Sequence, residues 1–165
     1  MKHSPGTTGR VEGDLLVEEG TIRTRKQIAV DFLQLVVSGQ IEDAYRKFVD
    51  MSGKHHNPFF SQGFDALKRA MIQNQANFPA KRIEVKTVIQ ERDYVVIHSH
   101  LTFNAGETGM IVIHMFRFAG KRITEFWDCG QEIPADSPNV DGAFWFRTPG
   151  VSPKTRSTRQ EQAGE

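Results

Sequence analysis

The sequence predicts an α+β fold in which three N-terminal helices cover one face of a curved antiparallel sheet. Apolar residues recur with a period of about 3.6 in three segments between residues 23 and 77, which is typical of amphipathic helices. Beyond Pro79 the period becomes about 2, which is typical of strands. Helices that precede a run of hairpins pack on one face of the sheet, and such a curved sheet can enclose a pocket.

The expected helices span residues 23–38, 41–48 and 64–77. Gly39 is well placed to end the first helix, and Pro79 stops the third. Between the second and third helices, the polar segment Lys54–Pro58 interrupts the period, so an irregular connection is expected there.

The expected strands span residues 82–90, 94–103, 110–118 and 122–129. Short connections join them, which predicts antiparallel hairpins. The longest connection, 104–109, contains Gly106 and Gly109 and is expected to be a turn. These glycines do not form a nucleotide-binding loop, because they lie between two strands.

The chain has 165 residues, which suits a single domain. We expect this domain over residues 23–146, between flexible tails at 1–22 and 147–165 that are rich in small, polar and charged residues. The net charge is only +1, which argues against nucleic acid as a partner. The single cysteine, Cys129, fits a reducing compartment, and no run of about 18 apolar residues predicts a membrane span. A cytoplasmic protein without a membrane partner is expected.

Three histidines and one aspartate interrupt the apolar strands. Alternation puts His98 and His100 on the same face of the second strand. His114 and Asp128 lie in the next two strands among bulky apolar residues. A buried polar group without a partner costs roughly 1–3 kcal/mol, so we expect these side chains to satisfy one another in one pocket.

Asp128 beside imidazoles predicts acid/base chemistry. Burial raises the pKa of a carboxyl group and a nearby imidazolium lowers it, and either balance suits proton transfer near neutral pH. Such a pair can move a proton next to a carbonyl group or activate a water molecule, and neither reaction requires a cofactor. A metal ion is the rival use of the same residues, but their spacing has no metal-specific signature. We therefore expect no metal and no cofactor.

A series of motifs follows the helical segments in order. They are His56-Asn57-Pro58, His98 in the second strand, the run from His114 to Ile123, Glu125-Phe126-Trp127-Asp128, Gln131, Ile133-Pro134, Ser137-Pro138-Asn139 and Gly142-Ala143-Phe144. With these motifs the sequence resembles the SnoaL-like polyketide cyclases of the nuclear transport factor 2-like superfamily. The resemblance extends over roughly residues 25–144, which is most of the expected domain.

The resemblance implies a cone-shaped α+β barrel with a deep apolar pocket, and dimers formed through the sheet. In the cyclases an aspartate on a late strand is the acid/base of an intramolecular aldol closure, and Asp128 matches it. The related limonene epoxide hydrolase carries a charged pair where this chain has His98 and His100, which disfavours epoxide hydrolysis. The oxyanion tyrosine of ketosteroid isomerase has no clear counterpart, because Tyr45 is expected to pack on a helix face.

Together these residues predict a cofactor-independent lyase or isomerase that acts on an apolar carbonyl compound. Asp128 is the expected general base, and His114 and His98 are expected to orient it or to protonate the enolate. The expected substrate-binding residues are His56, Asn57, His100, Phe116 and Phe126. The alternative is a non-catalytic ligand-binding or dimeric interaction module of the same fold.

Overall fold

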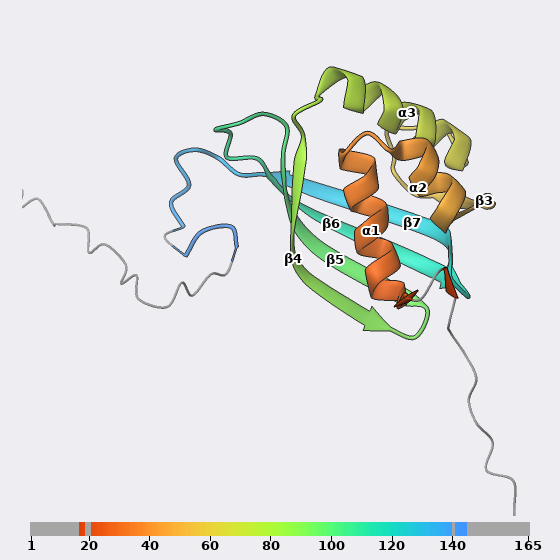
Figure 1. The fold of residues 1–165 in the computed structure, drawn as a ribbon. Helices are drawn as coiled ribbons and strands as arrows, with labels where there is room; N and C mark the ends of the chain where they lie inside the picture. The colour runs from red at the N-terminus through yellow and green to blue at the C-terminus, as the bar shows by residue number, and fades with distance from the viewer. Residues whose placement is uncertain (1–16, 19–20, 140, 145–165) are drawn as a thin grey trace, which may run out of the picture.

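The three helices lie where the sequence predicts them. The computed structural model describes residues 17–18, 21–139 and 141–144. Helices α1 (Arg25–Val37), α2 (Ile41–Phe48) and α3 (Phe64–Asn77) lie on one side of a curved sheet, and α1 runs across its strands (Figure 1). The expected α+β fold is confirmed. None of the described helices is long and apolar enough to cross a membrane.

Local signals set both ends of α1. The backbone N–H of Gln27 donates to Oγ1 of Thr24 (3.3 Å), and the backbone N–H of Thr24 donates to Oε1 of Gln27 (2.8 Å), which forms a capping box. At the other end, Gly39 adopts a φ of 82°, a left-handed conformation that favours glycine and ends the helix as predicted. Between the caps, Ile28, Phe32 and other apolar residues are buried against the sheet and α2.

The main sheet has five strands in the order β3-β7-β6-β5-β4, with β3 and β4 as its open edges. The strands are β3 (Val49–His55), β4 (Arg82–Glu91), β5 (Tyr94–Thr102), β6 (Met110–Ala119) and β7 (Arg122–Glu132). Strands β4 to β7 are the four predicted ones, and they pair as consecutive antiparallel hairpins.

The prediction misses one strand, β3, and with it the mixed character of the sheet. Strand β3 pairs with β7 in parallel, with His55 opposite Phe126. Only the two ends of β3 are buried, so no alternation of apolar residues marks it in the sequence. The segment Lys54–Pro58, expected to be irregular, therefore begins inside this strand. Its pairing with β7 brings residues 55–57 close to Asp128.

Two short strands, β1 (Val17–Glu18) and β2 (Thr21–Ile22), pair antiparallel within the segment predicted to be an N-terminal tail. The rest of that segment and the whole of the predicted tail at 147–165 lie outside the described residues. The end of the predicted domain at residue 146 also lies outside them and stays a prediction.

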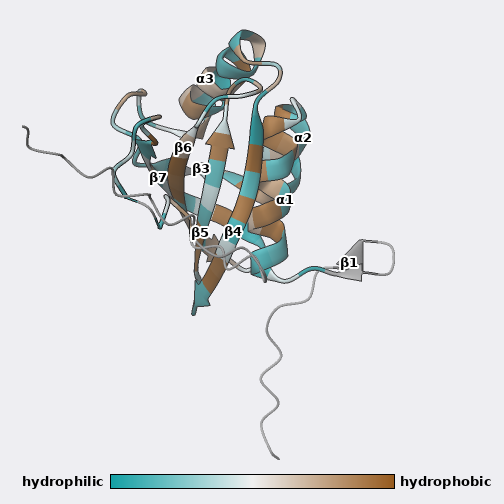
Figure 2. Ribbon diagram, turned by 90° about the vertical axis from the view of Figure 1, so that its left-hand side faces the viewer, coloured by the Kyte–Doolittle hydropathy of each residue, from teal (hydrophilic) through white to brown (hydrophobic). Residues whose placement is uncertain are grey.

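The register of the sheet decides which side chains face the helices. Ile97 in β5 lies opposite His114 in β6, which lies opposite Asp128 in β7, so these three side chains share the concave face. Ser99 is fully buried on the same face as Ile97. His98 points to the convex face, because neighbouring residues of a strand alternate. Figure 2 shows α1 and α2 on one side of the strands only.

Candidate functional site

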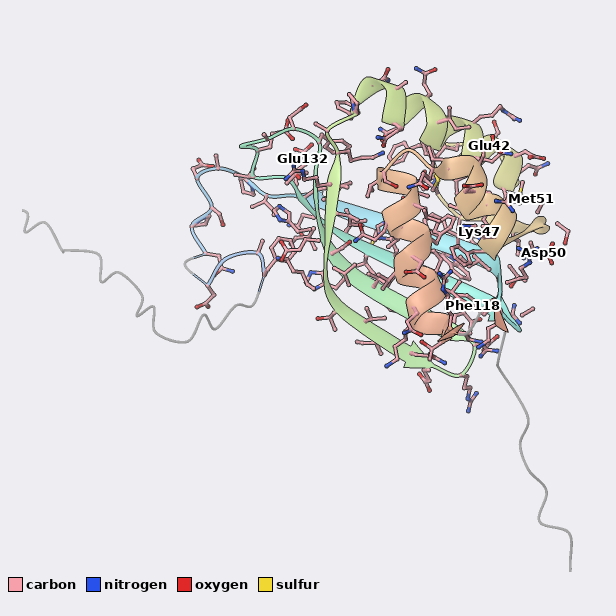
Figure 3. All side chains as sticks on the ribbon, viewed as in Figure 1. Glu42, Lys47, Asp50, Met51, Phe118 and Glu132 are labelled. Atoms are coloured by element: carbon pink, nitrogen blue, oxygen red, sulfur yellow. The ribbon has the colours of Figure 1, made fainter. Side chains whose placement is uncertain are left out.

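A cavity of about 490 Å³ lies between the helices and the concave face of the sheet. In Figure 3, Glu132 marks the end of β7 that pairs with the cavity-lining Met110, and Phe118 marks the opposite end of the hairpin. Most of the lining is apolar. It consists of Leu33, Val36, Val37, Pro58, Phe59, Phe60, Leu67, Ala70, Met71, Ile83, Leu101, Phe103, Met110, Val112, Cys129 and Gly130, together with the polar residues Asn57, Asn74, Lys81, His114 and Asp128.

Asp128 presents a carboxylate to this cavity from β7. The side-chain amide Nδ2 of Asn57 donates to both carboxylate oxygens, at 2.9 and 3.0 Å. Burial raises the pKa of Asp128 above its ordinary value, and the hydrogen bonds from Asn57 and the nearby His55 oppose that rise. The result is a partly desolvated carboxylate that one neutral amide holds in place.

The segment after β3 fixes the orientation of Asn57. The backbone N–H of Phe59 donates to Oδ1 of Asn57 (2.9 Å), so Nδ2 is the atom that faces Asp128. The ring of His55 closes the turn, since its Nε2 lies 2.8 Å from the carbonyl oxygen of Ser61 and its Nδ1 accepts from the backbone N–H of Asn57 at 3.3 Å. These contacts assign the proton of a neutral His55 to Nε2.

His114 lies beside Asp128 on the next strand and is almost fully buried. Burial lowers the pKa of its imidazole to about 4, so the ring is neutral at pH 7. Its ring packs near those of Phe116 and Phe126, with centroids at 6.3 and 5.9 Å. Among the described residues, nothing forms a hydrogen bond with its buried Nδ1. Such an orphaned nitrogen is uncommon in a folded protein and marks a place where a bound group can supply the partner.

The charge of Asp128 also affects Tyr45, for which the sequence predicts only a packing role. Its ring does pack edge-on against Phe32 and Phe64, as expected. Its buried hydroxyl donates to Sδ of Met71 (3.3 Å), and burial together with the charge of Asp128 raises its pKa. No pattern in the sequence links Tyr45 with Asp128, because the link depends on how α2 packs on the sheet.

The structure does not bring His98 and His100 to the cavity. Both rings lie on the convex face, where they contact the ring of Phe144 at centroid distances of 5.4 and 4.8 Å. The expected grouping of His98 with His114 and Asp128 is therefore corrected. Alternation within one strand defines two faces, but only the register with β6 tells which of them is concave.

Three further predicted residues also lie away from the lining. His56 stacks on Trp127 (centroids 4.6 Å apart), and its Nε2 lies 2.8 Å from a carboxylate oxygen of Glu125. Phe116 and Phe126 are almost fully buried in the core beneath His114. Of the eight residues predicted from the sequence, Asn57, His114 and Asp128 line the cavity.

The described residues contain no group of three or more His, Cys, Asp or Glu side chains that is placed to hold a metal ion. The side chains that line the cavity offer acid/base chemistry of their own. A desolvated carboxylate can accept a proton, and a neutral imidazole next to it can donate a hydrogen bond to a developing oxyanion. The apolar walls would exclude water from both groups.

The SnoaL-like domain model matches residues 29–126 of this chain. Solved structures with the same fold include an NTF2-like protein of unknown function from Cytophaga hutchinsonii (11% identity, TM-score 0.56). The match covers 68% of this chain and 94% of that protein's chain. They also include a candidate polyketide cyclase from Acidithiobacillus ferrooxidans (20% identity, TM-score 0.53, 67% and 91% covered). A candidate hydroxylase from Streptomyces galilaeus is a third (16% identity, TM-score 0.55, 65% and 88% covered). No curated protein matches the sequence. At these identities the structures establish the fold alone.

Protonation of His114 should make stability depend on pH. Its pKa is about 4 in the folded state against an ordinary 6.5, so the unfolded chain takes up a proton that the folded chain resists. The stabilisation is complete above pH 6.5 and is lost as the pH falls through 4, by at most about 3 kcal/mol. We expect His114→Phe to flatten the free energy of urea unfolding between pH 6.5 and 4. His98→Phe is the control and should keep the slope; an unchanged slope in His114→Phe would contradict the prediction.

Removal of the Asn57 amide should raise the pKa of Asp128 further. Its two hydrogen bonds favour the ionised carboxylate, and Asn57→Ala deletes both. Carboxyl ¹³C NMR titration of the two proteins measures the shift. Asn74→Ala removes another amide that lines the cavity and should leave the titration of Asp128 in place. A lower or equal pKa in Asn57→Ala would show that Asn57 does not stabilise the charge.

Proposed function

The chain belongs to the SnoaL-like domain family, and we propose that it binds a small apolar carbonyl compound and acts on it as a cofactor-independent lyase or isomerase. One observation carries this proposal. The Asp128 carboxylate lies in a mostly apolar cavity, where burial raises its pKa and Asn57 holds both of its oxygens. A desolvated carboxylate of this kind is a stronger base than an exposed aspartate.

In the proposed reaction, Asp128 takes a proton from the carbon next to a carbonyl group. The electron pair of the broken C–H bond moves toward the carbonyl oxygen, so an enolate forms. In a cyclase-like closure, the enolate carbon then bonds to a second carbonyl carbon of the same molecule, and Asp128 returns its proton to the new alkoxide. In an isomerisation, Asp128 returns the proton to a different carbon.

His114 would stabilise the enolate oxygen. Because its pKa is about 4, the ring is neutral at pH 7 and can donate one N–H without giving up its proton. A neutral imidazole also avoids a second charge beside Asp128 in a mostly apolar cavity. His98 has no part in this proposal, because its ring lies on the convex face.

A ligand-binding module without catalysis is the second candidate. One observation favours it: within the described residues, no hydrogen bond joins His114 to Asp128 although they are neighbours in the sheet. In a pure binding site, both groups would only orient a polar ligand. The two functions differ in whether a proton leaves the ligand, which is measurable.

A homodimer through the sheet and a cytoplasmic location complete the proposal. Ile89, Val96, Met115 and Trp127 lie in register across four strands and form an apolar row on the convex face. Ile89, on the edge strand β4, is 60% exposed, so a large apolar side chain of this row is open to solvent. A second copy of the chain would cover this row. The single thiol, Cys129, fits the reducing cytoplasm.

Proton transfer can be tested without knowing the product. We expect the protein to catalyse exchange of α-hydrogens for deuterium in a panel of apolar ketones and β-keto esters in D₂O, followed by ¹H NMR. Asp128→Asn should slow this exchange by about 100-fold or more, because the amide cannot accept the proton. Asp31→Asn changes a half-exposed aspartate of α1 and should exchange at the wild-type rate. Ligand binding without exchange in the wild type would favour the binding module.

The dimer depends on the apolar row of the convex face. Met115→Glu puts a charge in the middle of that row and should convert the dimer into a monomer, as measured by sedimentation equilibrium. Ile72→Glu on α3 alters a residue that is 40% exposed on the helical side and should leave the dimer intact. A wild-type protein that is already monomeric at micromolar concentration would contradict this part of the proposal.

A further inference from the structure

Lys81 lines the same cavity and has no part in the proposed proton transfer. It lies between α3 and β4 and is only 8% exposed, which is rare for a lysine. Its Nζ donates to Oδ1 of Asn74 (2.6 Å), another residue of the lining. Among the described residues, no carboxylate oxygen lies within 4.0 Å of Nζ of Lys81, so none forms an ion pair with it. The cavity therefore contains a sheltered cation whose one described side-chain partner is neutral.

Such a cation is costly, and two other sheltered lysines have a counter-charge. The side chain of Lys86 is 10% exposed and pairs with Glu84 at 2.6 Å. Lys68, at 22%, pairs with Glu42 at 3.0 Å. A buried charge without a counter-charge is strongly disfavoured, and burial accordingly lowers the pKa of Lys81. An anion in the cavity would supply the counter-charge that the described chain lacks.

Asn74 adds a second donor at the same place. Its Oδ1 accepts from Lys81, so its Nδ2 is left with two N–H groups. None of the described residues accepts a hydrogen bond from that nitrogen. An ammonium and an amide with unused N–H groups, both on the cavity wall, match the two oxygens of a carboxylate.

The Lys81 end of the cavity lies away from Asp128. Lys81 comes two residues before Ile83, which is level with Leu101 and Met110 in the sheet. From Met110 to His114, the neighbour of Asp128, is four residues along β6, or roughly 14 Å at 3.4 Å per residue. The two groups also have different partners, since Lys81 donates to Asn74 whereas Asp128 accepts from Asn57.

We propose that Lys81 and Asn74 bind a carboxylate group of the cavity ligand, so the substrate class is an apolar keto acid. Its carboxylate lies at the Lys81 end, and its reacting carbon lies at Asp128. The inference rests on the proposed function in one respect, namely that the cavity receives a carbonyl compound. The inference adds that this compound carries a negative charge, and that its charged end lies toward Lys81.

Two probes of equal length test the proposal by isothermal titration calorimetry. They are 8-oxononanoate, a keto acid with six methylene groups between its carbonyl groups, and its neutral amide. We expect the wild type to bind the acid at least tenfold more tightly than the amide, and Lys81→Met to bind the two equally while keeping its affinity for the amide. Lys68→Met, which removes a lysine of α3 that pairs with Glu42 of α2 and does not line the cavity, should keep the preference for the acid. Equal binding of both probes by the wild type, or no binding of the acid, overturns the carboxylate site.

A purely structural role for Lys81 gives a different result. If Lys81 only stabilised the C-terminal turn of α3, Lys81→Met would lower the thermal midpoint and weaken both probes by the same factor. Should that variant fail to fold, the wild type alone decides, because carboxylate binding raises the lowered pKa of Lys81 and so takes up a proton at alkaline pH. Calorimetry in buffers of different ionisation enthalpy measures this uptake, and an acid that binds without it overturns the proposal.

The two proposals fail in different ways. A preference for the acid without α-hydrogen exchange leaves the carboxylate site and contradicts the catalytic role of Asp128. Exchange in neutral ketones without a preference for the acid leaves the catalytic role and removes the carboxylate site. Asp128→Asn should bind the acid with an unchanged preference over the amide, because it alters the other end of the cavity.

Discussion

The structure is organised around one electrostatic constraint, namely that the Asp128 carboxylate is withdrawn from water and must be compensated. The compensation comes from Asn57, which the segment after β3 carries. That segment reaches Asp128 because β3 pairs in parallel with β7. The least regular strand of the sheet is therefore the one on which the site depends. A carboxylate held by a neutral amide keeps a raised pKa, whereas an arginine or lysine in the same place would lower it.

Side chains alternate along each strand between the concave face of the sheet and its convex face, and this alternation separates two environments. On its concave face, Ile97, His114 and Asp128 lie in one row beneath the helices. One residue away along the same strands, the paired residues His98 and Ile113 belong to the convex face. A shift of register by a single residue would exchange the two rows and move Asp128 out of the cavity. The dense packing of apolar side chains around α1 favours the observed register, and it thereby fixes the site as well as the fold.

Most of the fold could be predicted from the sequence, because most elements have a period of their own. Helices α2 and α3 begin and end at the predicted residues, and β4 to β7 begin there. Strand β3 could not be predicted, because only its two ends are buried and no apolar alternation marks it. The site was predicted only in part. Asp128 and His114 follow from polar residues in apolar strands, whereas the position of His98 depends on register and that of Lys81 on how a turn packs against α3.

The polar groups of the cavity reduce the stability of the fold, and they determine how a ligand is oriented in the cavity. The buried Nδ1 of His114 lacks a partner, and Lys81 is sheltered without a counter-charge among the described residues. Apolar side chains in both positions would pack the cavity at lower cost. A ligand that forms a hydrogen bond with His114 and supplies a counter-charge to Lys81 would offset this cost. A ligand that does so must be apolar along most of its length and polar at both ends, because the wall between His114 and Lys81 consists mainly of aliphatic and aromatic side chains.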